Sequence, residues 1–361
     1  MNDSLRERIN QLWREAYHLP FGEVKVRVLE ESLALTESLR DVDAIFIARL
    51  QLAAAGTASG HPEKAIPAYA WCLARFEEDP QRFQQHEHHL LWFFKNILHS
   101  VDEFPRLTLE QIEDLRTQMT SIYRRFGRNM RPVHYTRFVF SLRIGDLRQA
   151  AESLELYSAI PRDELADCLA CEADSEAEYY AFIGDMEKTL ATAGPNLRQE
   201  RTCAEVPHRI YCQVLKPLAL LGRYEEADEY QRKGYRLIRN NPTFLYHIAF
   251  QIAYLAHRNR RTSAVRMFEQ HLATAIETHQ LRSRFYFYAA AQHLLTQVAQ
   301  KKSSQKLNLP QAFPLYSDSQ EYDLATLIAW LDAELGALGP QFDARNRTNY
   351  FTQEIAAQLV Y

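Results

Sequence analysis

A six-residue turn motif recurs along this 361-residue chain and limits what it can fold into. Each copy has a residue that tolerates a positive φ, a polar start to the next segment and a small residue five positions after the first. Glycine or asparagine ends one helix in a left-handed cap, and the small residue lets the next helix pack closely against it. The motif therefore predicts helix hairpins. Its five copies are Gly60–Ala65, Gly145–Ala150, Gly184–Thr189, Gly222–Ala227 and Asn259–Ala264.

Between these turns the apolar residues follow helical spacing almost throughout. In residues 4–17, for example, Leu5, Ile9, Leu12 and Ala16 form one stripe of a helix. Strand-like alternation of useful length is missing from the sequence, so we expect an all-α fold. The expected helices are 4–17, 24–39, 41–58, 62–78, 84–101, 108–127, 132–143, 146–158, 164–183, 185–193, 203–221, 223–239, 243–258, 261–277, 281–300, 322–336 and 340–359.

The hairpins repeat at a nearly constant period. Successive turns from Gly145 are 39, 38 and 37 residues apart, and Gly60 to Gly145 covers two repeats. With glycine at the turn and alanine five residues on, the pattern resembles the tetratricopeptide repeat, although that family's period is shorter, about 34 residues. The resemblance implies a right-handed α-solenoid of about eight stacked helix-turn-helix pairs, and peptide or protein binding as its use.

Stacked hairpins share one interior, so we expect a single solenoid over residues 1–361 with one continuous hydrophobic core. Residues 1–40 are expected to be an N-terminal cap pair, 41–300 the core repeats and 324–361 the C-terminal capping helices. The segment 301–323, rich in serine and lysine and containing two prolines, is expected to be a flexible loop.

Charge is distributed unevenly along a chain whose net charge is only −4. Residues 151–188 hold eleven Asp and Glu against two Lys and Arg, and residues 230–306 hold thirteen Lys and Arg against two Glu. Such an excess creates a potential of several kT near the surface. We therefore expect a basic concave face in the C-terminal half, made of anion-binding arginines and two aromatic anchors. The predicted partner-binding residues are Arg232, Arg236, Tyr254, Arg258, Arg260, Arg261, Arg284 and Tyr288.

Two kinds of partner fit such a face. An acidic segment of a protein would pair its carboxylates with the arginines. A nucleic acid or nucleotide would offer phosphates to the same charges and bases to the aromatic rings, which would make the protein a regulator.

A cysteine pattern also suggests a metal site. Cys168 and Cys171 form a C-x-x-C, and Cys203 and His208 are expected near the start of the first helix of the next repeat. Neighbouring first helices lie about 8–10 Å apart, so the four side chains would form a structural zinc site of the Cys₃His type. The alternative is that all four are packing residues, because free cysteine is among the most buried residue types.

Other classes of protein are not indicated. The sequence has no G-x-G-x-x-G, no G-x-x-x-x-G-K-[ST] and no G-x-S-x-G, so we do not expect an enzyme. No apolar run approaches the ~20 residues of a membrane span, the N-terminus lacks a secretion signal, and five cysteines do not suggest a disulfide framework. A cytoplasmic location without a membrane partner is the resulting expectation.

Overall fold

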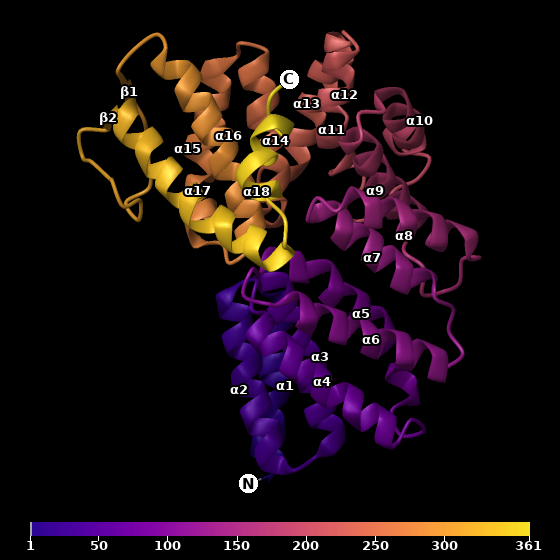
Figure 1. The fold of residues 1–361 in the computed structure, drawn as a ribbon. Helices are drawn as coiled ribbons and strands as arrows, with labels where there is room; N and C mark the ends of the chain where they lie inside the picture. Colours follow the sequence, from indigo (N-terminus) through magenta and orange to yellow (C-terminus); the bar gives the residue numbers. More distant parts are fainter. Residues whose placement is uncertain (1) are drawn as a thin grey trace.

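Helix hairpins build almost the whole molecule. The computed structural model describes residues 2–361, and its helices pair in chain order into eight hairpins (Figure 1). The chain is therefore an all-α solenoid of helical hairpins, as the sequence predicts. The hairpins are α1 (Asn2–His18) with α2 (Glu23–Leu39), α3 (Val42–Ser59) with α4 (Pro62–Glu78), α5 (Glu87–Ser100) with α6 (Leu109–Arg125), α7 (Arg131–Arg143) with α8 (Leu147–Ala159), α9 (Leu169–Phe182) with α10 (Met186–Leu197), α11 (Ile210–Gln213) and α12 (Leu215–Leu220) with α13 (Tyr224–Ile238), α14 (Leu245–His257) with α15 (Arg261–Glu277), and α16 (Leu281–Ala299) with α17 (Leu324–Asn346).

Short elements complete the chain. The 3₁₀ turns η1 (Gln84–His86), η2 (Val101–Glu103) and η3 (Pro242–Phe244) join or precede helices, and α18 (Tyr350–Gln353) and α19 (Ile355–Gln358) follow α17. Within residues 2–361, strands are confined to β1 (Ser304–Lys306) and β2 (Glu321–Asp323), which pair antiparallel with Gln305 opposite Tyr322.

The turn motif behaves as predicted. All five of its first residues have a left-handed backbone, with φ between 55° at Asn259 and 83° at Gly184. The small residues that follow are buried, as Ala65, Ala150 and Ala227 illustrate. Close packing of each second helix on its first helix follows from these two features.

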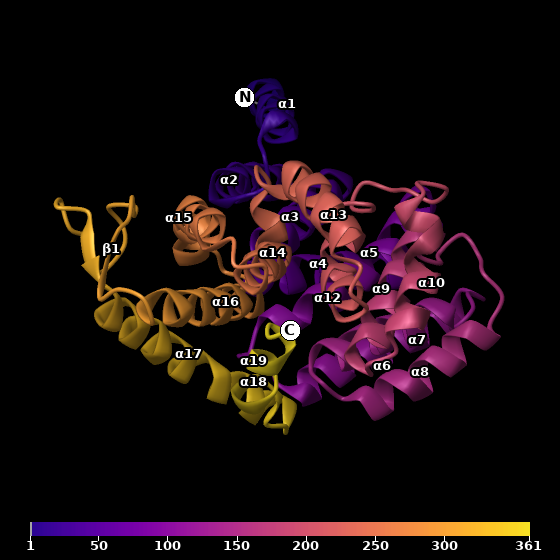
Figure 2. The same cartoon turned by 90° about the horizontal axis from the view of Figure 1, so that it is seen from above.

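The stack curves until its two ends touch. Figure 1 shows the N-terminal hairpins in the lower half and the C-terminal hairpins in the upper half, connected along one side by α7 to α10. Figure 2 shows the same curvature from above, with α16 and α17 on the opposite side of the molecule from α8 and α10. At the waist between the halves, η2 contacts α16 and α17.

Buried ion pairs fix this contact at the waist. The carboxylate of Asp102 in η2 pairs with Arg143 at 3.1 Å and with Arg282 of α16 at 2.6 Å. Ser283 donates its backbone N–H and its hydroxyl to Glu103, at 3.0 and 2.8 Å. Arg345 of α17 donates to three backbone oxygens of residues 101–104. Charged groups from η2, α7, α16 and α17 therefore neutralise each other in the interior, where the two halves of the molecule meet.

The apolar core runs along the whole stack. The buried apolar side chains form four groups along the stack. Polar pairs are buried between repeats in the middle of the stack, such as Arg131 with Glu172 at 2.7 Å and Arg209 with Asp174 at 2.7 Å. Buried ion pairs therefore accompany the apolar side chains in the middle of the stack.

The segment 301–323 is another correction, because it is anchored. It contains the β1–β2 ladder and buries Leu307, Leu309, Phe313 and Tyr322. Phe313 packs edge-on against Trp330 of α17, with ring centroids 4.8 Å apart. The composition of residues 301–323 suggested a flexible loop, but the widely spaced apolar side chains of this segment pack against the last hairpin.

The last long helix also differs from the sequence prediction, which placed a break between 336 and 340. In the structure α17 continues through Pro340 to Asn346, where Arg347 takes the left-handed conformation. Gly339 lies so close to Phe285 that an added Cβ would be 3.2 Å from that ring. Tertiary packing therefore holds the helix together across a residue that cannot donate a backbone hydrogen bond.

Candidate functional site

The first helices of the hairpins line a hollow of about 980 Å³ between the two halves of the molecule. The arginines that reach it are already paired. Arg209 is 2.7 Å from Asp174, and Arg143 and Arg282 share Asp102. The arginines that line this inner hollow are therefore neutralised by buried carboxylates of the protein itself.

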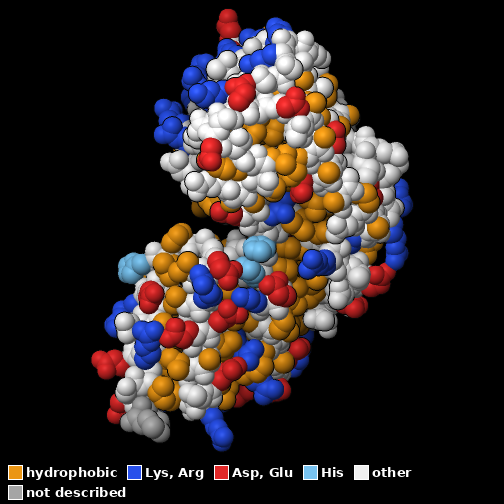
Figure 3. All heavy atoms as spheres, turned by 90° about the vertical axis from the view of Figure 1, so that its left-hand side faces the viewer, with side chains coloured by type: hydrophobic (Ala, Val, Ile, Leu, Met, Phe, Trp, Pro, Cys, Tyr) orange, Lys and Arg blue, Asp and Glu red, His pale blue; other side chains and the backbone are white. Residues whose placement is uncertain are grey.

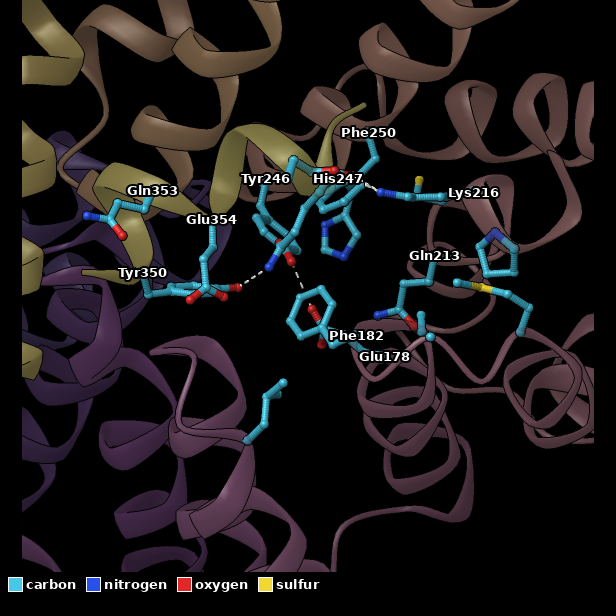
Figure 4. A pocket seen from close by; sticks show the side chains of 18 residues that line it. Glu178, Phe182, Gln213, Lys216, Tyr246, His247, Phe250, Tyr350, Gln353 and Glu354 are labelled. Carbon is cyan, nitrogen blue, oxygen red and sulfur yellow. Dashed lines mark hydrogen bonds between the residues drawn. The ribbon is translucent and has the colours of Figure 1, made fainter. Parts of the chain in front are cut away.

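A second cavity, of about 410 Å³, lies beside this hollow, and Glu178, Tyr246 and His247 line both. Figure 4 shows these side chains together with residues of the C-terminal segment, which forms one wall. The Tyr246 hydroxyl donates to Glu178 at 2.8 Å, and Lys216 Nζ donates to two carbonyl oxygens of residues 357–358, each at 3.0 Å. The chain's own C-terminal segment thus supplies part of the lining of this cavity.

The ionisable groups of this cavity are not arranged for nucleophilic catalysis. Burial raises the pKa of Cys212 to about 12, so its thiol is protonated at neutral pH. Burial also lowers the pKa of His247 well below its usual value, and this imidazole is neutral. Gln251, not a base, contacts the thiol sulfur, at 3.1 Å. The geometry suits packing better than proton transfer.

A third hollow, of about 380 Å³, lies where α15, the end of α16 and β1 meet, and we call it the basic pocket. Five cationic side chains line it together with one carboxylate, that of Glu269. That carboxylate accepts a hydrogen bond from the backbone N–H of Asn308 at 2.6 Å. The cationic side chains are Arg261, Arg266, Lys301, Lys302 and Lys306.

The positive charges of the basic pocket have few partners within the protein. Across residues 2–361, no ion pair within 4.0 Å involves any of its five cationic side chains. The Nε of Arg261 is buried and has no hydrogen-bond partner among the described residues. Arg261 is also the first residue of α15, where the helix dipole adds partial positive charge. Figure 3 shows Lys and Arg side chains gathered at the edge of the upper half.

The predicted partner-binding residues lie in different places. Arg261 belongs to the basic pocket, whereas Arg232 and Arg236 are exposed on α13, the second helix of the preceding hairpin. Arg260 and Arg258 both approach Asp228, the latter at 3.6 Å, so they form a local ion-pair group. The structure thus places the free arginines on second helices and not on the hollow lined by first helices. The expectation of a basic concave face is corrected accordingly.

Three predicted contacts are also corrected. Tyr254 and Tyr288 are 0% and 2% exposed, so neither ring is available as an anchor. Arg284 donates to carbonyl oxygens at the end of α15, including those of Ala275 and Ile276 at 2.8 Å each. Its guanidinium caps a helix and does not face a groove.

Sequence reasoning missed four residues of the basic pocket. Arg266, Lys301, Lys302 and Lys306 were part of the positively charged stretch, but the last three were placed in a flexible loop. Lys306 lies in the β1–β2 ladder, Lys301 and Lys302 lie between α16 and β1, and all three line the pocket beside α15. The available signal was that the charge excess continued through the end of α16 to residue 306.

The structure brings together three of the four side chains that were predicted to lie close to one another, namely the three cysteines. The sulfurs of Cys168, Cys171 and Cys203 lie within 4.8 Å of one another, and Cys171 Sγ is 3.4 Å from Cys203 Sγ. His208 lies outside the group, because its ring stacks on Phe244 with centroids 5.6 Å apart.

The reason is the position of the helix start. The prediction began a helix at residue 203, but α11 begins at Ile210, so Cys203 and His208 lie in the segment before that helix, where the His208 ring stacks on Phe244. Burial raises the pKa of Cys171 above its usual value, and the positive charge of Arg209 opposes this shift. The predicted Cys₃His set is therefore not brought together, and zinc binding at this place stays a prediction for the three cysteines alone.

No protein-family model matches the chain, and no curated protein matches it. Among solved structures, the chain is similar to the crystal structure of the TPR domain of P58(IPK), with 14% sequence identity, a TM-score of 0.25, and coverage of 97% of this chain and 96% of that one. A TM-score this low carries no argument about function. Across residues 2–361, no helix combines the length and apolar character needed to cross a bilayer.

Proposed function

We propose that the protein is a helical-repeat scaffold that binds an acidic segment of a partner protein at the basic pocket. One observation carries the proposal: five cationic side chains from α15, β1 and the residues between α16 and β1 surround one hollow against a single carboxylate. Like charges gathered in this way repel one another, and a ligand carrying negative charge would relieve that repulsion.

Carboxylates match the chemistry of the pocket. Arginine pairs with a carboxylate through two parallel N–H···O bonds, and lysine contributes a point charge. The buried Nε of Arg261, which lacks a protein acceptor, would gain one from the ligand. Each hydrogen bond to a charged group contributes about 1.5–3 kcal/mol. Two or three Asp or Glu side chains in an extended peptide would use the whole pocket.

A nucleic acid is the alternative ligand, because phosphates suit the same charges. Sequence-tolerant binding of single strands usually depends on aromatic side chains on which bases stack. The described residues that line the basic pocket include no aromatic side chain, and Tyr254 and Tyr288 are buried. These observations favour a peptide carboxylate over a stacked base.

The test is a titration of the full chain with a fluorescently labelled peptide rich in Asp and Glu. The double variant Arg261→Glu/Arg266→Glu reverses two charges that face the pocket. We expect its affinity to fall at least about 100-fold, equivalent to about 2.7 kcal/mol. Binding by the unaltered chain should also weaken steeply between about 0.01 and 1 M salt, because the Debye length falls from about 30 to 3 Å.

The matched control is Arg124→Glu/Arg148→Glu, which reverses two exposed arginines on α6 and α8 and makes the same change in net charge. Equal loss of affinity in both double variants would mean that only net charge matters. That result, or unchanged binding in the pocket variant, would contradict the proposal. Tighter binding of an oligonucleotide of equal charge would favour the nucleic-acid alternative.

A further inference from the structure

Three metal-ligating side chains meet at the waist, away from the basic pocket and the cysteines. Glu23 begins α2, His61 precedes α4, and His279 lies in the turn between α15 and α16. Their ligand atoms all lie within 4.8 Å of one another. The His61 Nε2 is 2.8 Å from a Glu23 carboxylate oxygen, and the two imidazole rings have centroids 4.7 Å apart. Residues from opposite ends of the chain thus converge on one point.

Both nitrogens of His61 face carboxylates. Its Nδ1 is 3.0 Å from Glu63 Oε1, and its Nε2 faces Glu23. A neutral imidazole carries one N–H, so it can donate to only one of these two carboxylates. The other contact needs a second proton or a cation. A carboxylate on the far nitrogen is the arrangement that orients metal-ligating histidines, with Glu63 in that role and Nε2 left to bind the metal.

The backbone holds the two halves of this group in contact. Gly60, which precedes His61, has φ +81°, and a Cβ added there would lie 2.7 Å from the Cβ of His279. The turn before α4 is therefore pressed directly against the turn before α16. His61 is buried, whereas Glu23 and His279 are exposed, so the group is reachable from solvent. Figure 3 shows histidine side chains at the waist between the two halves.

We propose that Glu23, His61 and His279 bind a divalent metal ion of the zinc class, with water as the fourth ligand. Two imidazoles and one carboxylate are ligands that zinc accepts, and tetrahedral zinc places ligand atoms about 3.3 Å apart. The present separations, 2.8 Å between His61 Nε2 and the Glu23 carboxylate and at most 4.8 Å within the group, lie on either side of that spacing. The ion would clamp the N-terminal hairpins to the α15–α16 turn, beside the buried ion pairs of η2 and α16.

The clamp is tested with the full chain, stripped of metal by a chelator and then titrated with Zn²⁺ and with Co²⁺ at neutral pH. We expect one Zn²⁺ equivalent to raise the melting temperature. The variants Glu23→Gln and His279→Ala should each lower the affinity at least about tenfold, and Glu63→Gln should lower it about 10- to 100-fold. His18→Ala, which removes an exposed histidine, is the matched control and should bind as the unaltered chain does.

The Co²⁺ spectrum separates this site from the thiols. Cobalt held by imidazole and carboxylate gives d–d bands without thiolate charge-transfer absorption, and these bands should be lost in His279→Ala but kept in Cys171→Ser. Zinc binding that is unchanged in both Glu23→Gln and His279→Ala would overturn the proposal. So would a metal effect that disappears only when Cys171 is replaced, or a melting temperature that zinc leaves unchanged.

Discussion

Replacing Arg282 by methionine should weaken the contact between the two ends of the solenoid. The Arg282 guanidinium lies 2.6 Å from Asp102 and 3.4 Å from Glu103, and the three side chains are 6%, 1% and 9% exposed. Burial alone would lower the pKa of Arg282, but the two carboxylates outweigh it and hold that pKa above its usual value. The arginine is therefore charged, and its removal leaves buried negative charge with fewer partners.

The loss of stability in Arg282→Met depends on the partners that Asp102 and Glu103 keep. Removing one member of a buried ion pair costs about 3–5 kcal/mol, because the other charge stays buried. Asp102 keeps Arg143 at 3.1 Å, and Glu103 keeps two hydrogen bonds from Ser283, so we expect the lower end, about 3 kcal/mol. At about 2 °C per kcal/mol for a large chain, the melting temperature should fall by about 6 °C.

Thermal unfolding followed by circular dichroism measures this change. The matched control is Arg148→Met, at a side chain that is 84% exposed, and it should change stability by less than about 0.5 kcal/mol. The double variant Asp102→Asn/Arg282→Met should lose less than the sum of the two single variants, because it removes both charges of one pair. Equal melting temperatures for Arg282→Met and Arg148→Met would refute the reasoning.

Two further predictions concern turns and buried histidines. Gly145→Ala should destabilise the protein more than Gly184→Ala. Both glycines have φ near +80°, but a Cβ added at Gly145 would lie 2.4 Å from the Tyr350 ring, whereas a Cβ added at Gly184 would meet no atom within 4 Å. Equal melting temperatures for the two variants would contradict this prediction. Burial lowers the pKa of His99 and of His271 to about 4. The unfolded chain then binds more protons between about pH 6.5 and 4, so the free energy of unfolding should fall as the pH drops through that range, by about 3 kcal/mol per histidine. Urea unfolding at several pH values checks this, and His271→Leu should show a smaller slope; an unchanged slope would contradict the assignment.

The hairpins were predictable because their signal is local. A glycine or asparagine that ends one helix and a small residue five positions later lie within one turn, and the left-handed backbone at Gly60 and Asn259 follows from chemistry visible in the sequence. The charge excess was visible for the same reason, since it lies in one continuous stretch of the chain.

The contacts at the waist were not predictable in this way. Pairing of Asp102 with Arg282, and of His61 with His279, depends on how far the solenoid curves before its ends meet. That curvature accumulates from small rotations between hairpins, which no local pattern in the sequence determines.

Burial of the predicted aromatic anchor has a related cause. Tyr288 was predicted as an aromatic anchor on the basic concave face, and it belongs to the run Phe285 to Tyr288 of α16. In the structure α16 packs against α14, α15 and α17, and all four side chains are buried. Where neighbouring helices enclose this part of α16 on several sides, consecutive side chains are all buried, and only the tertiary arrangement reveals this.

Hydrogen–deuterium exchange of the full chain, with and without a saturating Asp- and Glu-rich peptide, tests the proposed function most directly. Protection is expected in residues 261–269 and 298–306, which form the basic pocket. Protection in the hollow lined by the first helices, at residues 89–103 and 205–209, or no protection at saturation, would contradict binding at the basic pocket.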